Sequence, residues 1–529
     1  MRELKALELE CQQGRISRRE FMKRAVAMGI ALGVAPTFFP LGAKAAEGPR
    51  KGGRLRMGIA GASTTDTLVP AVMTDMMMEV LVCGQLGSNL MELDNQGRAV
   101  PELAESYESS PDAKTWVFKL KKGVEFHNGK TMTADDVIHS INLHRGAKSK
   151  SVAKAIVSPI QSVIKEDPYT VRFEMDAPNA DFPYILSDYH LVIVPEGSDG
   201  SEGIFTGGYK LKGFEPGVRS LAVRNPNYFR DDRAWFDEVE TIAINDTNAR
   251  TNALKTGQVD VINRCELKTV RFLERMPGVQ IIKQEGYKHY TFVMHTDKAP
   301  YNDNNVRMAL KYAVDREQLV KTVFRGYAVV GNDHPISTGN RYHAGDLPQR
   351  AYDPDKAKHY LKKAGLDRLK VALNVADAAF LGAVDAGVLF RESAARAGID
   401  VKVARVPNDG YWSNVWLKQP FCACYWGGRP TEDMMFSTAY ADDSAWNDSH
   451  WKNKRFNELL VAARGELDET KRKSQYGEMQ RLVRDDGGTI VPVFGMDVAA
   501  ASKKIGFHKP AVNWELDGMR APQRWWFKS

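Results

Sequence analysis

Short runs in which apolar and polar residues alternate recur along the chain. They predict β-strands, because successive side chains of a strand point to opposite faces of a sheet. Apolar residues occupy every second position in four such runs, 55–59, 116–120, 169–175 and 242–244. Between them lie stretches with apolar residues three and four positions apart, the spacing of one helix face. This alternation of strands and helices predicts an α/β fold.

The best-defined predicted helix follows Asp353. This residue is expected to cap the helix, Pro354 to occupy its first turn, and Gly365 to follow its last turn. The same apolar spacing predicts helices over 247–257, 305–324, 378–397 and 454–464. The chain contains no internal repeat, so the sequence does not indicate a solenoid.

The first 45 residues have the pattern of an export signal. Arg18-Arg19 precedes an uncharged stretch over 25–43, and Ala43-Lys44-Ala45 offers small residues for cleavage. This order predicts a twin-arginine signal peptide over 1–45, processing near Ala45, and a periplasmic mature chain. An N-terminal anchor helix is the alternative, but the stretch is shorter than the about 20 strongly apolar residues that a membrane span needs.

Length and charge narrow the class of protein further. The chain has 529 residues, which exceeds the about 250 to 300 at which one core stops growing, so at least two lobes are expected. Its net charge is +7, but residues 1–45 hold eight Lys/Arg and four Asp/Glu, which leaves +3 for the remainder. A charge this small gives no indication of nucleic-acid binding.

The spacing of the cysteines does not match a disulfide framework or a zinc site. Cys11 belongs to the predicted signal peptide, and the other four are Cys83, Cys265, Cys422 and Cys424. Their spacing differs from the C-x2-C pattern of zinc sites, and Cys422 and Cys424 lie as on one face of a strand, which is poor geometry for a mutual bridge. Buried free thiols are predicted, and a disulfide stays open as the alternative.

Signatures of catalysis and cofactor binding are absent from the sequence. The segment from Gly123 to Thr131 resembles a phosphate-binding loop, but it has five residues between its glycines where that motif has four. Turns at Gly123 and Gly129, followed by a helix-capping box from Thr133 to Asp136, explain it better. The eleven histidines are dispersed. We therefore predict no enzyme activity, no cofactor and no metal site.

Ordered blocks across the chain resemble the extracellular solute-binding proteins of family 5. These are receptors of ATP-driven importers for peptides, opines, nickel chelates and related solutes. The clearest block is Val100-Pro101-Glu102-Leu103-Ala104-Glu105-Ser106-Tyr107. Block 89–93 precedes it, and together with the later blocks, in order, these span nearly the whole mature chain: 112–120, 123–130, 133–137, 207–211, 224–228, 257–260, 305–310, 313–316 and 352–354.

The resemblance implies an α/β, two-lobed periplasmic binding protein of the clamshell, cluster C type with an extra inserted domain. Carried onto this chain, the first lobe comprises residues 46–85, 205–288 and 492–529, the inserted small domain residues 86–204, and the second lobe residues 289–491. The crossovers between lobes are then expected near 286–290 and 490–494. Gly487-Gly488 and Pro492 are residues that interrupt regular secondary structure, and they lie beside the second crossover, as expected for a hinge.

The segment from Phe421 to Asp433 is similar to the one that lines the ligand cleft in this family. The residues we expect there are Tyr425, Trp426, Gly427, Gly428, Arg429 and Asp433. Peptide-binding members have an aspartate three residues after the tryptophan, which holds the ligand's amino terminus. Here that position is Arg429, which pairs with carboxylate or phosphate and repels an ammonium, so an anionic solute is expected. A surface arginine and a core tryptophan are the alternatives.

Further residues lie in segments that resemble cleft-facing loops of the family: Tyr287, Asn332, His334, Tyr411 and Trp412. Aromatic packing would explain the three aromatic residues equally well. The expected partners are a small peptide-like, opine-like or other anionic solute and an inner-membrane ABC permease with its ATPase, and the protein is expected to be a monomer. A periplasmic sensor or chaperone, or a metal-chelate binder on the same fold, are the other functions considered.

Overall fold

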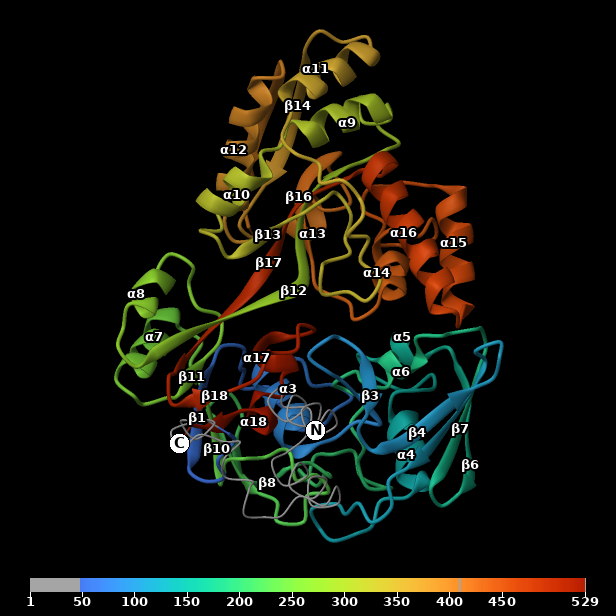
Figure 1. Cartoon of the computed structure of the whole chain (residues 1–529), viewed down its shortest axis with the longest axis vertical. Coiled ribbons are helices and arrows are strands. Elements are labelled where there is room, and N and C mark those ends of the chain that lie inside the picture. The colour runs from blue at the N-terminus through green and yellow to red at the C-terminus, as the bar shows by residue number, and fades with distance from the viewer. Residues whose placement is uncertain (1–47, 409–410, 529) are drawn as a thin grey trace, which may run out of the picture. The chain divides into compact units, whose positions relative to one another are not determined.

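One mixed sheet of eleven strands runs through most of the chain, and the computed structural model (Figure 1) describes residues 48–408 and 411–528 of it. The predicted signal peptide and its cleavage site lie outside the described residues. The strand order is β15-β14-β16-β12-β17-β11-β1-β10-β9-β8, with β13 also beside β17. The strands are β1 Arg54–Ile59, β8 Tyr209–Glu215, β9 Arg219–Arg224, β10 Glu238–Ala243, β11 Val261–Ile262, β12 Val279–Met294, β13 Ala328–Val330, β14 Leu369–Val375, β15 Ile399–Arg405, β16 Phe421–Trp426 and β17 Thr489–Ser502.

Two long strands, β12 and β17, connect the two ends of this sheet. They pair antiparallel from Val279 opposite Ser502 to Val293 opposite Thr489, and they lie side by side in Figure 1. Their register is irregular between Glu285 and His289. A second, shorter irregularity lies between Tyr290 and Phe292. Because a break in a ladder lets a strand bend, the pair can bend in this segment.

Beyond this segment, helices cover the sheet and form two cores. A large apolar cluster that includes Phe292, Leu373 and Val401 packs under α9 Asn304–Tyr312, α10 Arg316–Thr322, α11 Pro354–Lys363 and α12 Ala383–Ala395. A second cluster holds Trp426, Phe436 and Tyr476 and draws on α14 Glu432–Ala439, α15 Lys454–Gly465 and α16 Glu469–Asp486. The short helix α13 Tyr411–Asn414 precedes β16 in the chain.

At the other end of the sheet, segments distant in sequence share a core. This core includes Met57, Phe236 and Trp525, and the residues around it come from α3 Met76–Leu81, a π-helical turn η2 Val82–Leu86, α17 Glu515–Gly518 and α18 Ala521–Arg524. A smaller cluster lies under α7 Thr247–Lys255 and α8 Val270–Glu274. The last residues pair as β18 Ile505–Gly506 with β19 Trp526–Phe527.

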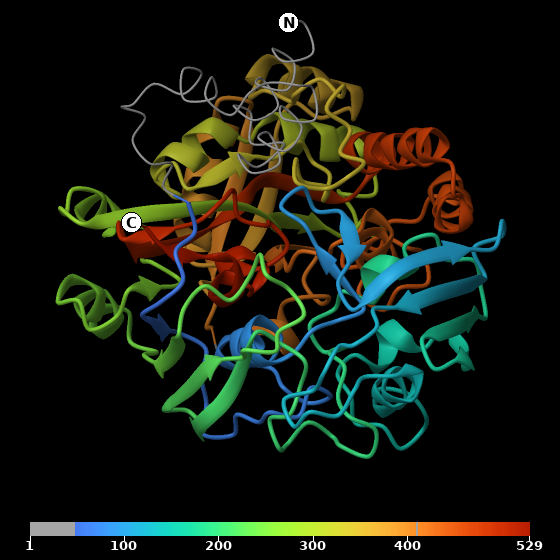
Figure 2. The same cartoon turned by 60° about the horizontal axis from the view of Figure 1, so that its bottom comes forward.

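A separate four-stranded antiparallel sheet lies between β1 and β8 in the sequence, drawn in light blue to teal in Figure 2. Its order is β4-β5-β7-β6, with bounds Ala104–Ser109, Thr115–Leu120, Thr170–Met175 and Ile160–Asp167. It has its own core, which includes Phe118, Phe173 and Phe182. The remaining elements here are β2 Met91–Leu93, β3 Ala99–Pro101, α4 Ala134–Leu143, α5 Lys154–Val157 and α6 Phe182–Ile185.

Most of the predicted elements are confirmed. The four alternating runs are β1, β5, β7 and β10, and the helix after Asp353 is α11, where the Asp353 side chain accepts a hydrogen bond from the Lys356 amide. The capping box from Thr133 to Asp136 opens α4. All four described cysteines are buried free thiols, as predicted. No described helix is both long and apolar enough to cross a bilayer.

Two predicted helices differ from the structure. The stretch 305–324 is not one helix, because Asp315 caps a new one: its carboxylate accepts from the Gln318 amide and separates α9 from α10. The helix expected over 378–397 begins only at Ala383, after Gly382 in the left-handed conformation with φ 90°. The longest helix, α16, was not predicted.

Candidate ligand-binding site

The loop expected to line the cleft connects β16 with α14. Trp426 is the last residue of β16 and lies opposite His289 of β12, so both side chains are on one face of the sheet. Helix α14 begins at Glu432, and its cap is the Thr431 side chain, which accepts from the Met434 amide. The loop is thus held between a central strand and a capped helix.

Trp426 is a core residue in this structure. Only 5% of it is exposed, and its ring lies 6.1 Å from that of Trp416 and 6.2 Å from that of Trp446. It belongs to the same cluster as Phe436. The surroundings of Trp426 therefore agree with the alternative considered from the sequence, that it is a core tryptophan.

Gly428 allows a close approach between two segments. A Cβ atom on Gly428 would lie 2.4 Å from the Cβ of Tyr287, whereas one on Gly427 would meet only the Arg429 guanidinium at 3.7 Å. Tyr287 is buried, and its hydroxyl donates to the carbonyl of Gly339 at 3.5 Å. The glycine is required here for packing against β12, not for a turn of unusual backbone conformation.

Arg429 is partly buried and lacks an acidic partner. Its Nη1 donates to the main-chain carbonyls of Gly427 and Gly428, both at 3.2 Å. In the described part of the chain no carboxylate lies within ion-pairing distance of it. Burial lowers the pKa of the guanidinium, while nearby Tyr189 and Asp188 act in the opposite direction. Arg429 is therefore close enough to Tyr189 and Asp188 for their charges to act on it, and its guanidinium keeps further N–H donors besides the one used on the two carbonyls.

The residues around Tyr189 form a charged group that sequence reasoning missed. Glu79 is buried in the apolar helix α3, and this burial, helped by the charge of Glu515, raises the pKa of Glu79 to about 8. Arg264 and a hydrogen bond from Tyr189 oppose that shift. Arg264 Nε donates to Glu515 at 2.8 Å. A single carboxylate inside the apolar run Met76–Leu81 was the one available signal.

The two acids at the start of α14 are already engaged. Asp433 accepts from Arg464 Nε at 3.1 Å, and its burial raises its pKa to about 6. Glu432 accepts from the Tyr342 amide at 2.6 Å, and burial raises its pKa to about 7. Asp433 is therefore bound to a neighbouring helix rather than presented to a ligand.

Three of the residues expected in cleft-facing loops are enclosed in the fold. Tyr411 is 1% exposed and its hydroxyl donates to the Ala423 carbonyl at 2.8 Å, which makes it a core residue. Asn332 accepts from the Arg350 amide at 2.9 Å. His334 is 1% exposed and burial lowers its pKa to about 3, so its ring is neutral at physiological pH.

Tyr425 and Trp412 form an exposed aromatic pair. They are 44% and 40% exposed, and their rings are 5.5 Å apart. Tyr425 lies opposite Tyr290 of β12, one position along from the pair of Trp426 and His289, so it points to the other face of the sheet. The structure thus separates the predicted residues: Tyr287, Trp426 and the glycine loop lie together, and Tyr425 with Trp412 lies apart.

A cavity of about 990 Å³ lies beside β12 and β17. Its volume is at the upper end of the range for small-molecule sites. Lys288 and Asp497 line it and pair with each other at 2.7 Å, and Arg264 and Glu515 also border it. Residues of the Trp426 loop do not line this cavity. Arg264 and Glu515 therefore lie between the cavity and the charged group around Glu79.

Comparison with known proteins places the chain in a family. Residues 98–448 match the family model described as "Bacterial extracellular solute-binding proteins, family 5 Middle", which is more than half of the chain. The chain belongs to this family. Its members are solute-binding proteins and not enzymes, and the resemblance noted in the sequence is confirmed.

Individual relatives are distant. The chain is 28% identical to Heme-binding protein A of Haemophilus influenzae over 50% of its own length and 53% of that protein, so it spans about half of this relative. It is 26% identical to the Dipeptide-binding protein of Escherichia coli K12 over 74% of its own length and 80% of the length of that protein. Among solved structures, AgaA from A. tumefaciens R10 in complex with agropinic acid is 23% identical, with a TM-score of 0.70 over 90% and 99% of the two chains. The α/β fold of cluster C periplasmic binding proteins is thereby confirmed.

Proposed function

We propose that the protein is the periplasmic substrate-binding receptor of an ABC importer and that it captures a small anionic solute, peptide-like or opine-like. The single observation that carries the choice of an anion is Arg429. Its guanidinium is partly buried, bonds only to main-chain carbonyls, and has no ion pair with any described residue. A partly buried guanidinium with no ion pair to a described residue keeps unused N–H donors, and a ligand carboxylate or phosphate would accept from them through two parallel hydrogen bonds.

The proposed ligand lies between the Trp426 loop and the charged group around Tyr189. Arg429 would hold the anionic end from one side. On the other side, Glu79 and Tyr189 offer a protonated carboxyl and a phenol. Asp188, whose Oδ1 already pairs with His190 Nδ1 at 2.7 Å, would offer its second oxygen to an amine. An opine-like or acidic amino-acid conjugate carries both kinds of group. The complex of AgaA with agropinic acid supports this class of ligand.

We propose that capture involves closure of two lobes, with the boundaries expected from the sequence. Separate cores support this division, since the clusters around Phe292, Phe236 and Phe118 draw on different segments. In this proposed division, the inserted domain would contact the second lobe through two pairs of residues. Asp181 and Arg472, which are both largely buried, lie 2.8 Å apart, and Arg341 donates to the Tyr184 hydroxyl at 3.3 Å. These contacts would form on closure and break on opening.

A metal chelate is the second candidate ligand. The fold brings His334 within 5.7 Å of His343, ring to ring, and places His289 near His334. His334 and His289 are at most 1% exposed, however, so neither ring is accessible to a ligand in this structure. We therefore rank this candidate below the anionic solute.

The proposed partners are an inner-membrane permease with its ATPase, with the protein as a monomer exported by the twin-arginine route. The experiment is to purify the protein from the periplasm without denaturation, release its ligand with acid, and identify it by mass spectrometry. We expect one small molecule per chain that carries a carboxylate or phosphate. A ligand that is uncharged or only cationic would contradict the role given to Arg429, and a haem or nickel chelate would favour the second candidate.

A further inference from the structure

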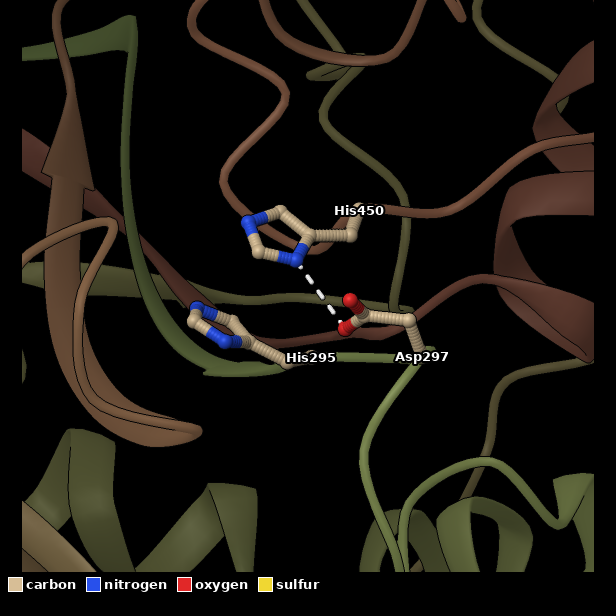
Figure 3. Close-up of side chains that lie close together, drawn as sticks. All are labelled: His295, Asp297 and His450. Atoms are coloured by element: carbon tan, nitrogen blue, oxygen red, sulfur yellow. Dashed lines mark hydrogen bonds and ion pairs between the residues drawn. The ribbon is translucent and has the colours of Figure 1, made fainter.

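Three potential metal ligands meet in the second lobe, away from the Trp426 loop. His295 and Asp297 directly follow the end of β12, and His450 lies in the loop between α14 and α15. Figure 3 shows their side chains converging from these two segments. Asp297 and His450 are 153 positions apart in the sequence, so no spacing motif could reveal the group.

The geometry of this group is close to that of a coordination site. His450 Nδ1 and Asp297 Oδ1 are 3.0 Å apart, and the two imidazole rings are 4.1 Å apart with 27° between their planes. One ligand atom from each residue lies within 4.8 Å of the others. Bonds of about 2.0 to 2.2 Å to a tetrahedral ion place ligand atoms about 3.3 to 3.6 Å apart, so coordination would require the three side chains to move closer together by up to about 1.5 Å.

Two further observations distinguish this group from an ordinary surface ion pair. His295 is only 3% exposed, and its Nε2 has no hydrogen-bond partner among the described residues. A buried ring nitrogen without a partner costs free energy unless something binds it. In addition, His450 has φ 54°, a left-handed conformation that is uncommon for residues other than glycine. Such strain is found where a side chain must be held in a particular place.

We propose that His295, Asp297 and His450 form a binding site for a borderline divalent transition-metal ion, of which Zn²⁺ is the test case. Two imidazoles and one carboxylate are a ligand set that suits Zn²⁺, Ni²⁺ or Cu²⁺ and does not suit Mg²⁺ or Ca²⁺, which prefer oxygen ligands. A fourth position would be open to water or to another ligand. Lys298, 3.9 Å from Asp297, is 61% exposed and can turn into solvent.

The ion would join the end of β12 to the loop before α15. These segments already share a main-chain hydrogen bond, from the Thr296 amide to the Ser449 carbonyl at 2.8 Å, and the Met294 amide donates to Gly488, just before β17, at 2.8 Å. The site therefore lies in the second lobe beside the start of β17. Because metal binds only the folded arrangement, occupation would raise the melting temperature of the protein.

The test is calorimetric titration of untagged, chelator-treated protein from the periplasm with ZnCl₂ alone, in parallel with thermal melting. The variants are His450→Asn, which tolerates the left-handed backbone, and Asp297→Asn, whose side chain is half exposed and whose substitution should not disturb folding. The matched control is His359→Asn, an exposed histidine of α11 outside the group.

We expect one Zn²⁺ per wild-type chain with an increase in melting temperature, and no binding of Mg²⁺. Each variant should bind at least about 10-fold more weakly and lose the thermal shift, while the control behaves as wild type. Failure of the wild type to bind Zn²⁺ below millimolar concentration would overturn the proposal. So would unchanged affinity in Asp297→Asn and His450→Asn, because the ion would then be held elsewhere, for example in the ligand cleft.

Discussion

Replacement of Asp333 by asparagine should strongly destabilise the protein. The Asp333 side chain is fully buried and pairs with two arginines: Arg316 Nη2 donates to its oxygens at 2.7 and 2.8 Å, and Arg350 Nη1 at 3.0 Å. The Val491 amide of β17 also donates to it, at 3.1 Å. Asparagine keeps the shape and tolerates the left-handed backbone at this position, φ 59°, so the substitution removes mainly the charge.

The structure sets the size of this effect. Removing one partner of a buried ion pair costs about 3 to 5 kcal/mol, because the other charge stays buried without compensation. Arg350 keeps a second carboxylate, Asp485 at 2.7 Å, and Arg316 keeps main-chain acceptors such as the Lys311 carbonyl at 3.1 Å. We therefore expect the lower end, about 3 kcal/mol, as a loss of unfolding free energy.

The assay is urea unfolding at pH 7, followed by circular dichroism, with Asp355→Asn as the control. Asp355 has a 90% exposed side chain that pairs with Lys358 at 3.3 Å, and its replacement should change stability by less than about 0.5 kcal/mol. A loss below about 1 kcal/mol in Asp333→Asn would refute the reasoning, because the two arginines would then not depend on this charge.

The same variant has a defined pH dependence. Burial alone would raise the pKa of Asp333, but Arg316 and Arg350 outweigh it, so the pKa is lowered. A lowered folded-state pKa contributes stability above the unfolded value of about 3.9 and loses it as pH falls through the folded value. The difference between wild type and Asp333→Asn should therefore be complete at pH 7 and shrink below about pH 4.

Three other results are expected. Replacing Arg18 and Arg19 by Lys should leave the precursor in the cytoplasm, and normal periplasmic accumulation would contradict twin-arginine export. The four mature cysteines should not react with a thiol reagent until the protein is unfolded, since all are buried, and rapid reaction of native protein would contradict that burial. Ligand should reduce the radius of gyration measured by small-angle scattering. The reduction should be smaller in Asp181→Asn, because this variant loses the ion pair with Arg472. An unchanged scattering profile at saturating ligand would contradict closure.

Local signals in the sequence were enough for many elements. Helix α11 was predicted with its cap because Asp353, Pro354 and Gly365 act within one or two turns. Helix α16 was not predicted because its few buried apolar residues, such as Tyr476 and Val483, are separated by many charged residues. Its apolar face becomes recognisable only once it packs against α15 and Phe436.

The candidate site was predictable only in part. The loop from Trp426 to Arg429 became a candidate through the family resemblance of its segment, but the burial of Trp426 depends on Trp416 and Trp446, which approach it only in the folded chain. The proximity of Arg429 to Asp188 joins positions far apart in the sequence and has no local signature. The same is true of His295 and His450, which were considered as isolated histidines.

The role of Arg429 is tested most directly by calorimetric titration with the ligand recovered from the periplasmic protein. The wild type would be compared with Arg429→Ala, Arg429→Asp and, as a control, Arg405→Ala, an exposed arginine of β15. Loss of the counter-charge should cost about 2 to 5 kcal/mol in Arg429→Ala, which is at least about 30-fold in affinity, and more in Arg429→Asp. The control should bind as wild type. Wild-type affinity in Arg429→Ala would contradict recognition of an anionic solute by this residue.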